Sequence, residues 1–104
     1  MNDRLPLEQL VPGLVARCPR FSTIWVDSLA QRTRDYDVDG GHKAAGNLEK
    51  GDVMFVLAVE PYMAQYESGE RLMYNVLVMS KDTVGWIVEW DEADITSFFR
   101  FPLK

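Results

Sequence analysis

The chain has 104 residues, of which 47% are hydrophobic and 12% aromatic, so it fits one domain with a core of its own. Its single cysteine, Cys18, excludes an internal disulfide and a cysteine-cluster metal site. The formal net charge of −5 arises mostly in residues 53–104, which carry four basic residues against eight acids. Nucleic-acid binders show the opposite balance, so nucleic acid is not expected as a partner.

No stretch of the chain approaches the ~18 apolar residues that are needed to cross a bilayer. The beginning, "MNDRLPLEQLVPG", contains Pro6 and Pro12 and lacks the apolar core of a signal peptide. We therefore expect a cytoplasmic protein without a membrane partner.

The first half of the chain predicts an arm, two strands and a long loop. Residues 1–11 form the expected N-terminal arm, and residues 12–104 the expected barrel domain. After Pro12-Gly13, "LVARC" (14–18) is typical of a strand. "STIWVDSL" (22–29) is the second, because apolar and polar residues alternate in it. The polar, Gly-rich and Asp-rich stretch 30–47 predicts a long first loop.

The second half predicts more regular strands at 52–60, 72–79 and 84–90, rich in β-branched and aromatic residues. Turns are expected at Gly51-Asp52, within the loop from 60 to 71, and at 80–83. Residues 91–95 predict a single helical turn, and "TSFFRFPL" (96–103) a last edge strand ended by Pro102. Strict alternation places Val84, Trp86, Val88 and Trp90 on one face. Six or so short strands without an amphipathic helix predict an all-β small barrel or sandwich.

Three of these segments, "LEKGDVMFVL" (48–57), "MYNVLV" (73–78) and "VGWIVE" (84–89), resemble the bacterial SH3-like domain in order and spacing. The resemblance covers about half of the chain, and the family's N-terminal arginine motif is absent. It implies a small SH3-like barrel, here with an N-terminal arm and a long first loop. Gly85 is expected to let a neighbouring strand approach closely.

The run "RDYDVDGGHK" (34–43) resembles the beginning of an EF-hand calcium loop. Asp35, Asp37 and Asp39 occupy loop positions 1, 3 and 5 and Gly40 the turn, but Gly46 stands where the loop needs a bidentate glutamate. The closing carboxylate and the flanking helices are missing. A solvated hairpin tip is favoured, and neither a metal site nor a cofactor is predicted.

Catalytic chemistry finds little support in the residues. Cys18 and His42 would be the only thiol–imidazole pair, and no third group activates them. Cys18 is expected to be a small core residue instead. No phosphate loop, zinc spacing or catalytic triad is present, so we do not expect an enzyme.

The aromatic residues indicate a binding function. In an SH3-like barrel, flat rings beside the loops hold extended or proline-rich segments, and neighbouring acids select a basic ligand residue. Trp25 and Phe55 are expected in the core. The candidate ligand-binding residues are Trp86, Trp90, Tyr62, Tyr66, Glu89 and Asp91.

The leading hypothesis is thus a non-catalytic binding or assembly module for a protein or peptide that is basic or proline-rich. The alternative is a structural subunit that self-associates through the edge strand at 96–101, as a homodimer or larger assembly. SH3-like modules recur as phage and mobile-element accessory proteins, so the resemblance implies such a role for the structural alternative. If 96–101 is a strand, Phe98 points away from Phe99 and Phe101, and the arm or a second copy must cover the outer ring.

Overall fold

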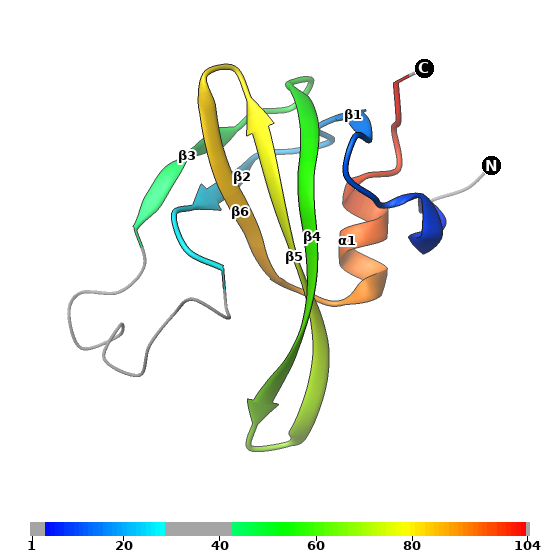
Figure 1. Ribbon diagram of the computed structural model, residues 1–104, viewed down its shortest axis with the longest axis vertical. Coiled ribbons are helices and arrows are strands. Elements are labelled where there is room, and N and C mark those ends of the chain that lie inside the picture. The colour runs from blue at the N-terminus through cyan, green and yellow to red at the C-terminus, as the bar shows by residue number, and fades with distance from the viewer. Residues whose placement is uncertain (1–3, 29–42, 104) are drawn as a thin grey trace.

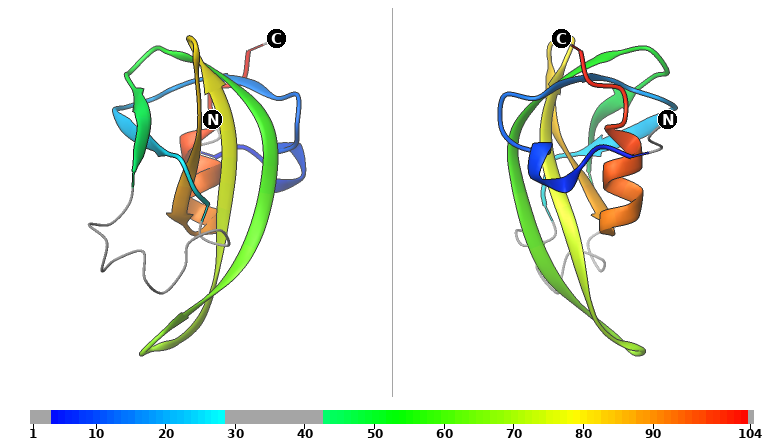
Figure 2. Two further views of the ribbon diagram at one scale, coloured as in Figure 1. Left: turned by 60° about the vertical axis from the view of Figure 1, so that its left-hand side comes forward. Right: turned by 90° about the vertical axis from the view of Figure 1, so that its right-hand side faces the viewer.

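The computed structural model describes residues 4–28 and 43–103, apart from the side chain of Glu89. These residues form one antiparallel sheet of six strands, curled into a half-barrel with an α-helix against its inner face (Figures 1 and 2). The predicted all-β small barrel is therefore confirmed as the fold class. The aspartate run 35–39, Tyr36 and His42 lie outside the described residues.

The strands follow each other across the sheet in the order β1-β4-β5-β6-β2-β3. Their bounds are Val15–Arg17 for β1, Ser22–Trp25 for β2, Ala44–Leu48 for β3, Val53–Tyr66 for β4, Gly69–Ser80 for β5 and Thr83–Trp90 for β6. The antiparallel strands predicted at 53–59, 72–79 and 84–88 are confirmed by the pairing of β4 with β5 and of β5 with β6.

Two predicted turns connect these strands, and an ion pair joins them. Gly51 has a φ of 93°, which favours glycine, and the Asp52 carboxylate accepts a hydrogen bond from the Glu49 N–H at 2.8 Å. Lys81 begins the tight β5–β6 turn with a φ of 55°. Its Nζ lies 3.0 Å from Oδ2 of Asp52, so the two turns are held side by side.

Gly85 explains how the sheet curls. A Cβ at this position would lie 2.9 Å from Cβ of Ile24 and 3.1 Å from Cβ of Ala45. Because Gly85 has no side chain, β2 and β3 fold closely over β6. The predicted close approach at Gly85 is confirmed.

Residues 96–98 belong to a helix, so the predicted edge strand is wrong there. Helix α1 covers Glu92–Phe98, and its N-terminus is capped by the Asp91 carboxylate, which accepts from the Asp94 N–H at 2.8 Å. The buried residues Ile95, Phe98 and Phe99 have the spacing of one helical face. Phe98 and Phe99 therefore both reach the core, which the strand prediction had excluded.

Both ends of the described chain pack on the barrel. The arm contains the 3-10 helix η1 (Leu7–Gln9), buries Leu5 and Leu10 in the core, and donates the Leu5 N–H to the Thr96 carbonyl at 2.9 Å. After α1, the Leu103 N–H donates to the Val15 carbonyl at 2.8 Å. Residues 101–103 thus pair with β1 and cover its outer edge. The end of the segment predicted as an edge strand therefore does pair with a strand.

Two segments predicted as loops are strands. β3 begins inside the stretch 30–47, at Ala44, and ends at Leu48, although its small and polar residues have low strand propensity. Most of the predicted loop from 60 to 71 consists of paired strand residues, since β4 continues to Tyr66 and β5 begins at Gly69. Pro61 is tolerated because β1 pairs only with the beginning of β4, which leaves β4 an edge strand at Pro61.

The core lies between the inner face of the sheet, α1 and the arm. Tyr74, Val76 and Val78 of β5 all face it, as their alternation predicts. Phe55 does not belong to it. Its ring is 44% exposed on the outer face, so the expectation of a core ring is wrong, because Met54 and Val56 take the inward positions of β4. Trp25 is half-buried.

Candidate functional site

The two tryptophans of β6 lie on opposite faces of the sheet. Trp86 pairs with Leu77 on the outer face, whereas Trp90 pairs with Tyr74 on the inner face. The register shifts between these pairs, because β6 contains one more residue than β5 does over this stretch. One extra residue reverses every later side chain, so the alternation predicted through Trp90 is wrong.

Neither tryptophan offers an open face for a ligand. Trp86 is only 7% exposed. The ring of Trp90 packs edge-on against Phe98, with centroids 4.7 Å apart, and the Arg20 guanidinium lies 5.3 Å from its centroid. Both rings are thus used in packing.

The other predicted site residues are also dispersed. The Asp91 carboxylate caps α1, and the side chain of Glu89 lies outside the described part. Tyr62 and Tyr66 lie together on the far hairpin, exposed and away from both tryptophans. The structure therefore does not assemble the predicted aromatic groove.

The hairpin that holds these tyrosines carries several exposed apolar side chains. The ends of β4 and β5, residues 60–73, extend past the beginning of α1 as a two-stranded ribbon (Figures 1 and 2). We call this segment the protruding hairpin. Only Glu67 and Ser68 separate its strands, and Gly69 takes a φ of 119° at the tip.

Every second side chain of β5 points to the core, and we call this row the core-facing stripe. On the inner face of the protruding hairpin the stripe continues past the part of the sheet that α1 covers. Along this stripe Val76 is fully buried, Tyr74 is 8% exposed and Leu72 is 44% exposed. Met63, directly opposite Leu72 on β4, is 48% exposed. The apolar alternation therefore continues into a part of the hairpin that no other described element covers. As a result, Leu72 and Met63 at this end of the stripe are exposed to solvent.

The outer face of the same hairpin is also partly apolar. Tyr62 and Tyr66 stand on it, two pleats apart. Ala64 between them and Met73 opposite Tyr62 are buried. The protruding hairpin thus shows large apolar side chains on both faces.

Acids surround the protruding hairpin. The segments 60–71 and 89–94, which form the hairpin and the beginning of α1, hold seven acids and one arginine, a formal charge of −6. This charge is one unit more negative than the −5 of the whole chain. The rest of the molecule is therefore close to neutral, and the negative potential is concentrated at this end.

A second exposed apolar group crosses the outer face of the sheet at the other end. Phe55, Met79 and Val84 are directly opposite one another on β4, β5 and β6. Each is more than a third exposed, and Leu57 beside them is as well. We call Phe55, Leu57, Met79 and Val84 the outer row.

The Cys18 thiol and the Asp52 carboxylate both serve the packing of the fold. Cys18 is buried in the core as predicted, and its thiol donates to the Arg20 carbonyl at 2.8 Å. Burial raises the pKa of this thiol, which keeps it protonated and unreactive. The Glu49 N–H, and then the Lys81 ammonium, lower the pKa of the Asp52 carboxyl. Asp52 is thus engaged in holding the two turns.

Metal ligands do not cluster in the described residues, where no three His, Cys, Asp or Glu side chains gather around one point. Within the same residues, α1 and η1 are far too short to cross a membrane. Comparison with known proteins gave no match: no protein-family model, curated protein or solved structure is similar enough to be matched to this chain. The resemblance to the bacterial SH3-like domain stays a prediction.

Proposed function

We propose that this protein is a non-catalytic binding module whose partner is a protein or peptide segment with both basic and apolar side chains. The observation that carries the proposal is the protruding hairpin, which leaves Met63 and Leu72 on one face and Tyr62 and Tyr66 on the other exposed. A two-stranded ribbon that projects from a sheet is stabilised less than its central strands are. Exposed apolar side chains gathered in one place mark interaction sites. A partner packed on the hairpin would bury them.

The charge around the hairpin determines the chemistry of the partner. With a formal charge of −6 in its bordering segments, this end of the molecule attracts and orients a basic chain. A second copy that presented the same hairpin would bring two acidic regions together. The proposed partner is therefore a different chain, with Lys or Arg beside large apolar residues.

Selection of random peptides on the immobilised protein tests this function. We expect the enriched peptides to combine Lys or Arg with large apolar residues. Leu72→Ser and Met63→Ser should each weaken their binding about tenfold, since losing one apolar contact at the centre of an interface costs roughly 1.4 kcal/mol or more.

The matched control is Phe55→Ser in the outer row, because Phe55 has the same 44% exposure as Leu72 but lies on the opposite face, toward the other end of the sheet. It should leave the affinity unchanged. Enrichment of acidic peptides, or an equal loss of affinity in Phe55→Ser and Leu72→Ser, would contradict the proposal.

The outer row supports a second candidate function, a structural subunit that self-associates. Residues 96–98 of the edge strand on which this idea first rested belong to helix α1, but Phe55, Met79 and Val84 form an apolar row across three strands. Two of the charges beside it, Lys81 and Asp52, are paired with each other. Two copies can therefore meet here without bringing their acidic ends together.

Sedimentation equilibrium distinguishes this candidate from the first. If the outer row joins two copies, the chain sediments as a dimer, and Met79→Asp returns it to a monomer because a charge is then buried in an apolar interface. Leu72→Asp, on the protruding hairpin, is the control and should leave the dimer intact. A monomer at high protein concentration would reject self-association.

A further inference from the structure

The segment after α1 closes one edge of the sheet. Strand β1 pairs with β4 on one side, and on its other side it pairs with residues 101–103, which we call the strap. Two backbone hydrogen bonds hold the strap to β1. The Arg17 N–H donates to the Phe101 carbonyl at 2.9 Å, and the Leu103 N–H donates to the Val15 carbonyl at 2.8 Å. The edge that β1 would otherwise present to another chain is thus covered.

Pro102 ends the sheet on the outer side of the strap. It lies opposite Ala16, between the two hydrogen bonds. In an antiparallel pair, the residue between two such bonds turns its backbone nitrogen away from the neighbouring strand. At Pro102 this nitrogen carries no hydrogen, so the strap offers no donor there to a further strand. A proline in this position opposes edge-to-edge pairing.

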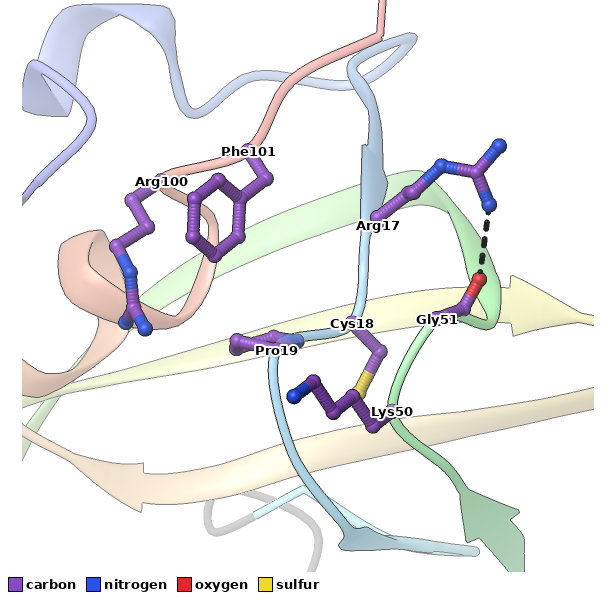
Figure 3. Close-up of a pocket in the computed structure, with 7 residues that line it drawn as sticks. All are labelled: Arg17, Cys18, Pro19, Lys50, Gly51, Arg100 and Phe101. Carbon is purple, nitrogen blue, oxygen red and sulfur yellow. Dashed lines mark hydrogen bonds between the residues drawn. The ribbon is translucent and has the colours of Figure 1, made fainter.

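The side chains of the strap contribute little to its attachment. Phe101 is 49% exposed and Leu103 is 38% exposed. In Figure 3 the Arg17 side chain points away from Phe101 and toward the β3–β4 turn, where its Nη1 donates to the Gly51 carbonyl at 3.0 Å. The strap is therefore attached mainly through its backbone.

A pocket of about 400 Å³ lies between the beginning of the strap and the barrel (Figure 3). Arg100 and Phe101 line it on one side. The Phe101 ring does not fill this space, and the Arg100 guanidinium lies 4.7 Å from the centroid of the ring. Atoms that face a space lose packing contacts, so we expect the strap to open more easily than the core does. The barrel contributes Arg17, Cys18, Pro19, Lys50 and Gly51 to the lining.

Without the strap, the β1 edge is complementary to a second copy of itself. Val15 and Arg17 each turn one N–H and one carbonyl to this edge, and the strap bonds to only one group of each. If two copies meet with Ala16 on a two-fold axis, Arg17 of each copy lies opposite Val15 of the other. Antiparallel pairing in this register can use both groups of each residue.

We propose that residues 101–103 are a detachable strap, which guards the β1 edge and, when it opens, lets two copies of the chain pair through β1. Helix α1 stays in place during this opening, because Phe98 and Phe99 fix its end in the core. The strap and β1 share no residue with the protruding hairpin or the outer row. The strap therefore acts independently of the proposed function.

Hydrogen exchange of the unaltered protein tests the opening. The Arg17 N–H donates to the strap, whereas the adjacent Cys18 N–H donates to the Asp52 carbonyl at 2.7 Å. We expect the protection factor of the Arg17 amide to be roughly a hundredfold lower than that of the Cys18 amide, since local opening frees only the first. Equal protection of the two amides would mean that the strap opens only when the barrel unfolds, and would overturn the proposal.

Leu103→Pro weakens the strap in the full chain, because it removes the N–H that donates to the Val15 carbonyl. The Arg17 amide should then exchange about fivefold faster, as expected for the loss of one hydrogen bond. Leu103→Ala is the matched control, since it removes the same side chain but keeps the N–H. It should change the exchange rate of the Arg17 amide by no more than about twofold.

Sedimentation equilibrium of the same two variants tests the pairing of two copies. Both variants carry Met79→Asp in addition, so that association through the outer row does not contribute. Leu103→Pro should form dimers at a protein concentration at which Leu103→Ala is still a monomer. Equal masses of the two variants at every concentration would overturn the pairing through β1. If Leu103→Pro does not fold, the comparison of the Arg17 and Cys18 amides in the unaltered protein still decides whether the strap detaches.

Discussion

Replacing Phe98 by alanine is expected to lower the free energy of unfolding by about 3 to 5 kcal/mol, the usual cost of removing a fully buried ring. Phe98 has no exposed surface and packs edge-on against both Trp90 and Phe99. Its loss would leave a cavity between α1 and the inner face of the sheet. Denaturant unfolding followed by tryptophan fluorescence measures the change.

Phe101→Ala is the matched control for Phe98→Ala. Three residues further on, its ring is 49% exposed and lies after the end of α1. We expect this variant to cost no more than about 1 kcal/mol, within the range of half-exposed side chains. Equal destabilisation by Phe98→Ala and Phe101→Ala would contradict this difference in burial.

Leu10→Ala should lower the free energy of unfolding by about 2 to 5 kcal/mol, because Leu10 is 3% exposed and belongs to the core. The adjacent Val11 is 47% exposed, so Val11→Ala should stay within about 0.5 kcal/mol of the original protein. The same unfolding experiment compares the two.

This comparison determines whether the arm is an appendage or a part of the barrel. If Leu10→Ala were no more harmful than Val11→Ala, the arm would contribute little to the core. The bond from the Leu5 N–H to the Thr96 carbonyl leads us to expect the opposite, since it fixes the arm against α1.

The regular parts of the fold were predictable because local patterns determine them. The alternation of Tyr74, Val76 and Val78 is uninterrupted, and all three side chains face the core. The same rule failed at Trp90, where one extra residue in β6 reverses the pattern. A bulge depends on how two strands pair, so the sequence of one strand does not reveal it.

Helix α1 could have been recognised from its own residues. Asp91 and Asp94 stand at the positions of a helix cap, and Ile95, Phe98 and Phe99 have helical spacing. The three phenylalanines near the end of the chain, Phe98, Phe99 and Phe101, were interpreted as part of a strand, and a period of two was applied to them. Short apolar runs permit both interpretations, and the acidic cap was the better signal.

The candidate site was harder to predict because it depends on long-range contacts. Tyr62 and Tyr66, which were expected to bind a ligand, are exposed. Met63 and Leu72 are exposed because the short helix α1 does not reach over the hairpin. The length of α1 could not be predicted from the hairpin residues themselves. The pocket lined by Arg17, Lys50 and Arg100 likewise combines residues from three distant segments. No spacing in the sequence connects them.

The most direct test of the central claim is to map a selected basic peptide on the protein by amide chemical shifts. The proposed function predicts that the largest shifts fall on the protruding hairpin, at residues 62–63 and 70–73, and that Leu72→Ser reduces them. Shifts concentrated at the outer row, around Phe55, Met79 and Val84, would contradict the assignment of the partner to the hairpin.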